Sequence, residues 1–242
     1  MKINYCTKCI LPDTRPNINF NYKTSTCDAC LNKENKKKID WTYRKKLFTN
    51  LIKDIKIQKK KYDCIIPVSG GKDSTWQVVV ALEYGLHPLC VTWKTPARNS
   101  LGAENLQNLI NLGVDHIDFS INPKIEKKFT LKTFKKKGSP VIPMHMALHA
   151  IPLQLATKFK IPLILWGENS SYEYGDDKTL KVLKFNHIWL LIYVVPTGTT
   201  PLDLVDSELS EHDLTPYSLP TDEAQNKAGV KSVFLGHYFN CD

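Results

Sequence analysis

The sequence predicts an α/β fold with a doubly wound parallel sheet, and three observations lead to this prediction. Short apolar runs alternate with stretches of helical periodicity from residue 62 to residue 166. The first of these runs is followed by the Gly-rich turn Ser69-Gly70-Gly71-Lys72-Asp73-Ser74. A chain of 242 residues, 42% of them hydrophobic, can build one substantial core and a small appendage. Alternating strands and helices of this kind form parallel sheets with right-handed crossovers.

The elements follow one another in a regular order. Strands are predicted where β-branched and apolar residues run together, and helices where apolar residues recur every three or four positions. Gly113 and Gly138 mark two helix ends, and Pro152 should kink the last helix. The predicted strands are 64–68, 89–93, 116–120, 161–166 and 231–235, and the predicted helices are 75–84, 102–112, 125–136 and 144–159.

Three regions are predicted along the chain. Residues 1–34 form a cysteine-bearing knuckle, and residues 35–61 form a basic amphipathic helix that bridges to the main domain. Residues 62–242 form the α/β domain. Within that domain, residues 175–184 are polar and 196–226 are rich in Pro, Thr, Asp and Glu, so both segments are expected to be irregular.

Four cysteines of the first region have the spacing of a metal site. Cys6 and Cys9 form one Cys-x2-Cys pair, and Cys27 and Cys30 form a second pair seventeen residues later. Two such pairs close a tetrahedral structural Zn²⁺ site, and metal binding would stabilise a segment that has few large apolar groups. Disulfides and an iron–sulfur cluster are the alternatives. The further cysteines Cys64 and Cys90 lie in predicted strands and are interpreted as buried core thiols.

The turn at residues 69–74 is predicted to hold phosphate groups. A strand that ends in a Gly-rich turn before a helix presents backbone N–H groups and the positive end of the helix dipole to an anion. Ser69 and Ser74 offer hydroxyl groups, and Lys72 adds a full positive charge. The spacing excludes a Walker A loop, because Ile66 stands at its first glycine position and Asp73 follows the lysine. The alternative is an ordinary Gly-rich turn.

The composition of the chain argues against nucleic acid and membranes as its partners. The net charge is +9, but the positive residues are nearly all lysines, and the arginines are Arg15, Arg44 and Arg98. Because arginine is the preferred reader of phosphates and bases, the lysine runs favour solvated faces over a nucleic-acid track. The N-terminus lacks the apolar stretch of a secretory signal, and the apolar run 188–195 is far shorter than the ~20 residues of a membrane span. A soluble, cytoplasmic protein is expected.

The turn at 69–74 resembles the PP-loop of ATP pyrophosphatases, and further blocks resemble one family of them, the N-acetyl sugar amidotransferases. These enzymes act in bacterial surface-polysaccharide and pseudaminic-acid-type pathways, including lipopolysaccharide biosynthesis and flagellin glycosylation. The blocks are Cys9-Ile-Leu-Pro-Asp-Thr-Arg-Pro16, the turn itself, Gly167-Glu-Asn-Ser-Ser-Tyr-Glu-Tyr-Gly175, Leu214-Thr-Pro-Tyr-Ser-Leu-Pro220, and the stretch from Ala228 to Tyr238. The resemblance covers the front part of such an enzyme, so the chain is expected to be C-terminally truncated.

The resemblance implies an ATP-dependent amidotransferase that converts an acetamido group of a sugar to acetamidino through an adenylylated imidate. Ser69, Gly70, Gly71, Lys72 and Ser74 would surround the phosphates of ATP. The end of the strand at Val91 and Trp93 would meet adenine, and Gly167 and Asn169 would lie on the same rim. Catalytic roles fall to Lys72, Asp73 and Glu168, with Asp73 holding Mg²⁺. The alternatives are a helix cap for Asp73 and a structural carboxylate for Glu168.

No glutaminase arrangement is visible in the sequence, so the ammonia should come from a partner. The resemblance implies glutaminase and synthase-type subunits like those of histidine biosynthesis, together with an N-acetylated sugar substrate. A tRNA-thiolating PP-loop enzyme and an inactive nucleotide-binding fragment are the alternative functions. His145 and His149, four residues apart on a predicted helix, are interpreted as packing or substrate-contact residues rather than as a metal pair.

Overall fold

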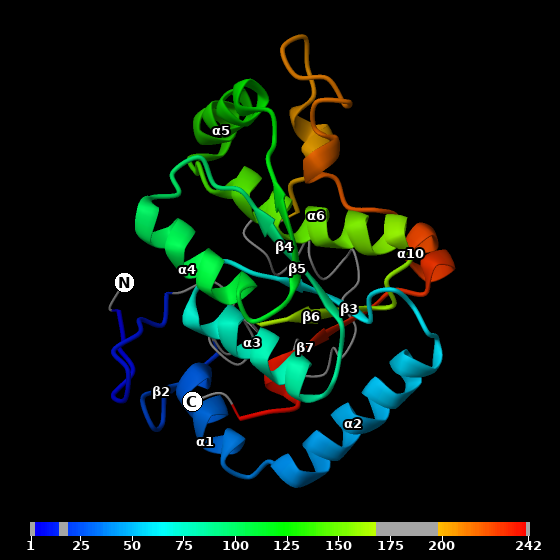
Figure 1. The fold of residues 1–242 in the computed structure, drawn as a ribbon. Coiled ribbons are helices and arrows are strands. Elements are labelled where there is room, and N and C mark those ends of the chain that lie inside the picture. The colour runs from blue at the N-terminus through cyan, green and yellow to red at the C-terminus, as the bar shows by residue number, and fades with distance from the viewer. Residues whose placement is uncertain (1–2, 15–18, 168–197, 241–242) are drawn as a thin grey trace. The chain divides into compact units, whose positions relative to one another are not determined.

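The computed structural model describes residues 3–14, 19–167 and 198–240 (Figure 1). The chain divides into two compact units. One unit comprises Met1–Phe48, Glu168–Lys184 and Phe234–Asp242, and the other comprises Thr49–Gly167 and Phe185–Val233. The larger unit contains the sheet and the smaller one contains the cysteine pairs, and each is described by itself.

The larger unit is built on a five-stranded sheet, which confirms the predicted parallel α/β fold. Its strands are β3 (Cys64–Pro67), β4 (Pro88–Trp93), β5 (Asp115–Phe119), β6 (Leu163–Trp166) and β7 (Lys231–Phe234), in the order β5-β4-β3-β6-β7. β3 pairs in parallel with β4 and with β6, and β4 pairs in parallel with β5. The strand order reverses between β3 and β6, so the carboxyl ends of these two strands flank the topological switch point.

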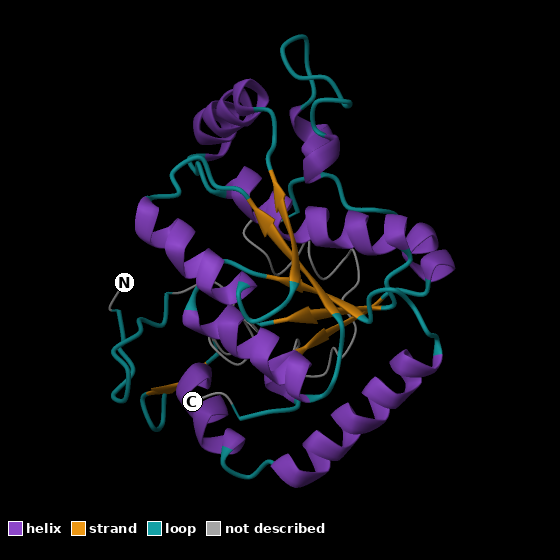
Figure 2. Cartoon of the chain, viewed as in Figure 1, coloured by secondary structure: helices purple, strands orange, loops and turns teal. Residues whose placement is uncertain are grey.

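Helices cover both faces of this sheet (Figure 2). They are α3 (Lys72–Glu83), α4 (Ser100–Ile110), α5 (Pro123–Lys137) and α6 (Ile142–Phe159). The chain moves from β3 to β5 in one direction and returns to β6 in the other. Right-handed crossovers therefore place α3 and α4 on one face and α6 on the opposite face. α6 continues through Pro152 as one helix.

Two of the helices, α4 and α5, begin earlier than the predicted spans because of their caps. Asn99 accepts a hydrogen bond from the Gly102 N–H at 2.8 Å, and Asn122 accepts one from the Lys124 N–H at 3.0 Å. Such side-chain acceptors start a helix before its apolar periodicity becomes visible. Residues 196–226, predicted to be irregular, contain the short helices η1 (Pro201–Leu204), η2 (Thr215–Tyr217) and α10 (Asp222–Ala228) in their described part.

The core of the larger unit extends beneath η2. The Tyr217 ring is buried edge-on against Phe129, with 4.7 Å between the ring centroids. On α6, the Gln154 amide donates to the carbonyl oxygens of Thr215 and Ser218 at 2.7 and 2.6 Å. These bonds hold η2 against α6, so a segment late in the sequence completes the core.

The smaller unit is short and poor in regular structure. The hairpin of β1 (Phe20–Asn21) and β2 (Thr26–Cys27) leads into α1 (Asp28–Lys36). α2 (Trp41–Ile57) follows, and the division between the units falls after Phe48. The predicted helix over 35–61 is therefore wrong at its start, because residues 35 and 36 end α1 and a break precedes Trp41. Phe48 packs against Tyr238 and Phe239, each at 5.2 Å between ring centroids.

In the described part of the chain, no helix combines the length and the apolar character needed to cross a bilayer.

We predict that Tyr217→Phe leaves the free energy of unfolding unchanged or raises it by up to about 1 kcal/mol. The Tyr217 hydroxyl is buried and has no hydrogen-bond partner among the described residues, so removing it relieves an unmet desolvation cost. Tyr217→Ala should instead cost about 3–5 kcal/mol, because it leaves a cavity beside Phe129. Chemical denaturation of both variants is the measurement. A loss above about 1 kcal/mol in the Phe variant would mean that the hydroxyl is bonded.

Candidate functional site

The predicted phosphate turn lies between β3 and α3, at the carboxyl end of the central strand. The Val68 N–H donates to the Val91 carbonyl oxygen at 2.9 Å, which continues the pairing with β4 up to the turn. α3 then begins at Lys72. The turn therefore occupies the switch-point edge of the sheet, where ligands of doubly wound folds bind.

Two glycines shape this turn for different reasons. Gly70 has a φ of +82°, and a Cβ there would lie 2.7 Å from the backbone nitrogen of Leu106. Any side chain at Gly70 would therefore be strained and would clash with α4. Gly71 has a φ of −77° and is the N-cap of α3, without a side-chain cap. A Cβ at Gly71 would approach only the Ser69 hydroxyl, at 3.4 Å, so the glycine keeps the helix start open.

The two serine hydroxyls brace the turn internally. The Ser69 hydroxyl oxygen accepts from the Gly71 N–H at 3.3 Å, so its proton can be donated to an anion. The Ser74 hydroxyl accepts from the Ser69 N–H at 3.3 Å and donates to the Gly71 carbonyl at 3.0 Å. Ser74 is buried and spends its proton inside the turn. The structure thus gives Ser74 a scaffold role, although the sequence predicts that it is a phosphate donor.

Lys72 and Asp73 stand together at the first turn of α3. The Lys72 ammonium lies 2.7 Å from a carboxylate oxygen of Asp73, and both side chains are exposed. An exposed ion pair of this kind is weak, so it contributes little to the stability of the turn. The lysine charge and the carboxylate both lie at the mouth of the turn.

A buried hydrogen-bond chain anchors the end of β3 to its neighbours. The Thr92 hydroxyl donates to the Val68 carbonyl at 2.8 Å and lies 2.9 Å from Nε2 of His116. Because the hydroxyl has only one proton to donate, His116 must supply the N–H of the second bond. Burial lowers the pKa of His116, which favours the neutral ring. Neither residue is predicted from the sequence, because the pairing depends on the register of β4 with β5.

Gly167 is required by packing at the end of β6. A Cβ at this position would lie 2.8 Å from three atoms of the Gln77 side chain. Gln77 is buried on α3, one turn after Ser74, and its amide nitrogen has no hydrogen-bond partner within the described residues. This contact brings the end of β6 against α3 at the switch point. Gln77 is thus a rim residue that the sequence analysis missed, and its polar character within an apolar face of α3 is the signal that could have revealed it.

The structure treats the other residues predicted to lie near ATP in different ways. Val91 is buried in β4, and its carbonyl already accepts from Val68. Trp93 ends β4 and is partly buried. Glu168 and Asn169 lie outside the described residues. A role for Val91 in adenine binding therefore gains no support from its side chain, and that of Trp93 stays a prediction.

His149 packs in the interior, which is one of the two roles predicted for it, whereas the role of the His145 side chain stays a prediction. The His149 ring stacks on Trp166 with 5.3 Å between centroids, and its Nδ1 lies 2.8 Å from the His145 carbonyl oxygen. Burial lowers the pKa of His149 to about 4, so the ring is neutral near pH 7. The backbone contact occupies one ring nitrogen, which fits a packing role.

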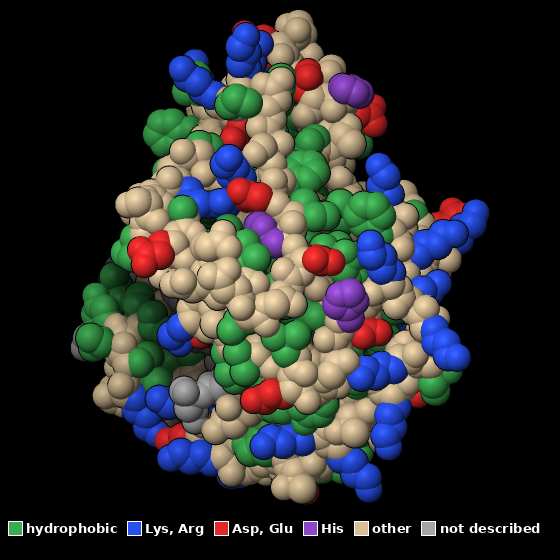
Figure 3. All heavy atoms as spheres, viewed as in Figure 1, with side chains coloured by type: hydrophobic (Ala, Val, Ile, Leu, Met, Phe, Trp, Pro, Cys, Tyr) green, Lys and Arg blue, Asp and Glu red, His purple; other side chains and the backbone are tan. Residues whose placement is uncertain are grey.

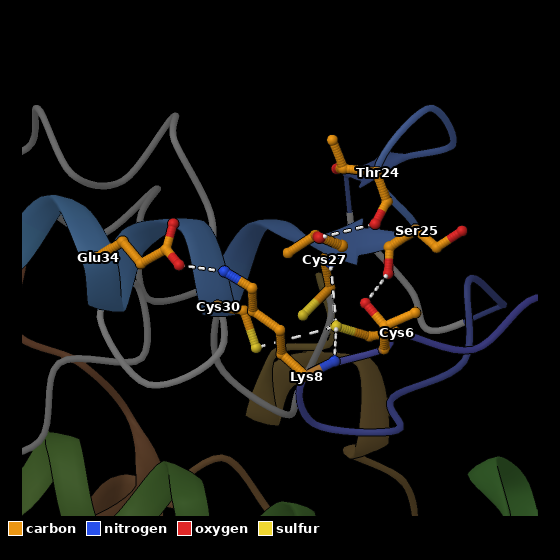
Figure 4. Close-up of polar contacts among 9 residues, drawn as sticks. Cys6, Lys8, Thr24, Ser25, Cys27, Cys30 and Glu34 are labelled. Carbon is orange, nitrogen blue, oxygen red and sulfur yellow. Dashed lines mark hydrogen bonds and ion pairs between the residues drawn. The ribbon is translucent and has the colours of Figure 1, made fainter.

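The four knuckle cysteines converge in the smaller unit, and Figure 4 shows three of them, Cys6, Cys27 and Cys30. The sulfur atoms of Cys6, Cys9, Cys27 and Cys30 all lie within 4.8 Å of one another. Cys6 and Cys30 are separated by 3.9 Å and Cys9 and Cys27 by 3.4 Å, and all four are free thiols. A tetrahedral Zn²⁺ with bonds of about 2.3 Å would space its sulfur ligands about 3.8 Å apart. The cluster therefore fits a zinc ion.

The surroundings of this cluster favour thiolate at Cys6. Burial alone would raise the pKa of Cys6, but backbone N–H groups donate to its sulfur and lower the pKa to about 6. The donors include Cys27, at 3.3 Å, and Lys8, at 3.4 Å. Burial and the neighbouring thiols raise the pKa of Cys27 and of Cys30. A cation bound among the four sulfurs would favour the thiolate form of all four cysteines and so lower these pKa values.

Lys8 and Glu34 close one side of the knuckle. Their side chains form an ion pair between the first Cys-x2-Cys pair and α1 (Figure 4). The pair is exposed, so its contribution to stability is small. The cysteines, and not this ion pair, must therefore hold the two halves of the knuckle together.

Cys64 and Cys90 are buried in β3 and β4, as predicted. Burial raises the pKa of the Cys64 thiol well above its usual range and raises that of Cys90 to about 12. A thiol with such a pKa is protonated near pH 7 and is a poor nucleophile. Both cysteines therefore belong to the core.

A scan against protein-family models finds no match, and a search of curated proteins finds none either. Solved structures show partial similarity. An NH3-dependent NAD synthetase from Campylobacter jejuni has 14% identity and a TM-score of 0.44, over 57% of this chain and 62% of that chain.

Two further structures have comparable scores. A predicted subunit of a tRNA methyltransferase from Methanocaldococcus jannaschii has 14% identity and a TM-score of 0.37, over 71% of this chain and 66% of that one. An NMN synthetase from Francisella tularensis has 16% identity and a TM-score of 0.39, over 79% of this chain and 82% of that one. The chain thus spans less than two thirds of the first two proteins. With TM-scores below 0.5, these matches carry no functional argument, which must come from the residues of this chain.

We predict that the purified protein carries one Zn²⁺ per chain and that Cys9→Ser and Cys27→Ser each lose it. Either change removes one of four ligands whose binding energy stabilises the knuckle. Elemental analysis gives the metal content, and Cys90→Ala is the matched control because Cys90 lies in the sheet. Full zinc content in both knuckle variants would contradict the site.

We also predict that Gly167→Ala lowers the free energy of unfolding by about 1–3 kcal/mol. The new methyl group would overlap the buried Gln77 side chain. Shortening that side chain makes room, so the double variant Gly167→Ala/Gln77→Ala should lose less than the sum of the single variants. Denaturant unfolding of the four proteins measures this coupling. Strictly additive losses would show that the two residues do not meet.

Proposed function

We propose that the chain binds ATP through the turn at residues 69–74 and belongs to enzymes that release pyrophosphate from ATP. The open start of α3 at Gly71 carries this proposal. A helix N-terminus without a side-chain cap, next to a glycine with φ of +82°, offers backbone N–H groups and dipole charge to a phosphate. Its place at the switch-point edge of the sheet is where a nucleotide would be expected.

The residues of the turn suit a leaving pyrophosphate. Backbone N–H groups near Gly70 and Gly71 and the Ser69 hydroxyl can donate to phosphate oxygens, while Lys72 supplies a full positive charge. Asp73 is exposed at the same turn, so its carboxylate can join phosphate oxygens around Mg²⁺. Together these groups would neutralise the charge that develops on the β- and γ-phosphates.

For the reaction itself, we infer amidination of an N-acetyl group on a bacterial surface sugar. The amide oxygen would attack the α-phosphorus, and pyrophosphate would leave. Ammonia would then attack the imidate carbon, and AMP would leave with the former amide oxygen. The sequence blocks at 9–16, 167–175 and 214–238 support this choice. Glu168 is proposed to orient the incoming ammonia, which a glutaminase partner would supply.

The tRNA-thiolase alternative is less well supported. A thiolase of this kind would be expected to use reactive cysteines near the rim, whereas Cys64 and Cys90 are buried in strands and have raised pKa values. The four other described cysteines form the knuckle cluster. We assign that cluster a structural Zn²⁺, because all four positions of a tetrahedral ion would be filled by protein ligands.

We predict that Gly71→Ala weakens ATP binding at least about tenfold while changing the free energy of unfolding by less than about 1 kcal/mol. The methyl group is tolerated by the fold, since φ is −77° and only the Ser69 hydroxyl lies near. It would nevertheless stand where the phosphate approaches, and the larger Gly71→Val should act more strongly. Isothermal titration calorimetry and thermal unfolding separate the two effects. Equal ATP affinity in both variants and the wild type would refute the cradle.

We further predict AMP and pyrophosphate, not ADP, as the products of ATP in the presence of an N-acetyl sugar, Mg²⁺ and ammonium. A sugar labelled with ¹⁸O in its acetamido group should transfer the label to AMP, because that oxygen becomes adenylylated. Mass spectrometry detects the label and the change from oxygen to NH in the sugar. Pyrophosphate release with tRNA but not with sugar would favour thiolation. Absence of release with either substrate and with a glutaminase present would mark a nucleotide-binding fragment without turnover.

A further inference from the structure

An apolar groove lies along α5, outside the residues assigned to the phosphate turn. It has a volume of about 470 Å³. Three prolines from separate segments, Pro96, Pro123 and Pro140, form its walls together with Leu131 and Phe134 of α5. All of these residues belong to the larger unit, so the groove is a feature of one folded body.

The groove leaves large apolar side chains open to solvent. Leu131 is 49% exposed and Phe134 is 54% exposed. The opposite face of the same helix is buried through Phe129 and Thr133, so α5 already has its contact with the core. A single exposed leucine is ordinary, but a concave group of leucine, phenylalanine and proline is typical of a docking surface.

The groove is set in strongly basic surroundings. α5 contains seven lysines and one acidic residue, Glu126, which is among the residues that line the groove but is buried. Lys127 lines the groove, and Lys124 and Lys135 are exposed within one helical turn of lining residues. Figure 3 shows Lys and Arg side chains beside hydrophobic ones at the top of the view, over α5. A partner for this surface must therefore bring apolar and negatively charged groups together.

The chain itself shows how α5 binds acidic residues. Lys132 forms an ion pair with Asp206, which lies in the acidic stretch after η1. This contact holds the pKa of the Asp206 carboxyl down at about 2. On one side of α5, Lys132 is thus paired with an acidic segment of the same chain. On the side of the groove, lysines lie next to an exposed apolar surface.

We propose that the α5 groove docks an acidic segment of a partner protein, with an aliphatic or aromatic side chain of that segment inserted beside Leu131 and Phe134. Carboxylates flanking the inserted side chain would face Lys124, Lys127 and Lys135. This is the arrangement of an amphipathic segment in a hydrophobic groove, with the charges fixing its orientation. The inference does not depend on the chemistry at the phosphate turn.

The test uses the whole chain and two short synthetic amphipathic peptides that differ only in charge. Both carry leucine and phenylalanine at helical spacing; one has glutamates at the remaining positions and the other has lysines. Fluorescence anisotropy should show binding of the glutamate peptide alone. Raising the salt from about 50 to about 300 mM should weaken this binding several-fold. Phe134→Ser should weaken it at least about tenfold, as expected for a central aromatic contact.

Phe159→Ser is the matched control, because Phe159 is a 53% exposed phenylalanine at the end of α6. It should leave binding unchanged, and thermal unfolding of both variants checks that each is folded. Equal binding of the two peptides, or equal effects of the two substitutions, would overturn the proposal. A concentration-dependent dimer of the free protein that Phe134→Ser dissociates would overturn it in favour of a second copy as the occupant.

Discussion

The close approach of two backbones at Gly70 is the constraint on which the phosphate turn depends. A Cβ at this position would lie 2.7 Å from the backbone of Leu106, so the turn can pass α4 only as glycine. Once the chain has passed that point, Gly71 can start α3 without a cap, and the serine hydroxyls close the turn on itself. The buried Thr92 hydroxyl donates a hydrogen bond to the carbonyl of Val68, the residue just before the turn. The geometry of the turn is thus imposed by packing within the protein.

The cysteine cluster solves a different physical problem. In the described part of the smaller unit the strands have two residues each, and the buried apolar side chains other than cysteine are Phe48, Leu235, Tyr238 and Phe239, so packing alone gives it little stability. The four sulfurs lie within 4.8 Å of one another, and the raised pKa values of Cys27 and Cys30 oppose full deprotonation of the cluster unless a cation binds among them. Metal binding there would stabilise the fold of this unit, while the turn that we propose binds ATP lies in the larger unit.

Much of this arrangement could be predicted from sequence because it depends on local patterns. The alternation of strands and helices in the sequence predicts the parallel sheet, and the Cys-x2-Cys spacing predicts the cluster of sulfurs. The hydrophobic periodicity places the starts of α4 and α5 too late, because Asn99 and Asn122 cap these helices before the first periodic residues. The roles of Gln77, Thr92 and His116 could not be predicted, because each depends on which strand or helix lies beside it. The sequence predicts that Ser74 donates to a ligand, but it does not show the bond from the Ser74 hydroxyl to the Gly71 carbonyl oxygen.

The same distinction explains Gly167. Its place at the end of a strand suggested room for a nucleotide, whereas the contact that requires glycine is the buried Gln77 side chain on α3. The rim of the site is therefore defined partly by protein packing, and the turn at residues 69–74 is the portion where we propose that backbone N–H groups bind a ligand.

The most direct measurement is amide NMR of the protein labelled with ¹⁵N-glycine and ¹⁵N-serine, titrated with pyrophosphate and with a non-hydrolysable ATP analogue plus Mg²⁺. We predict downfield shifts of the Gly71 and Ser74 amide protons with both ligands, because both N–H groups lie at the start of α3 and Gly71 would exchange its 3.3 Å bond to the Ser69 hydroxyl for a charged acceptor. Gly113, at the end of α4, should not respond. Binding of the analogue with unchanged Gly71 and Ser74 signals would contradict the assignment of this turn as the phosphate site.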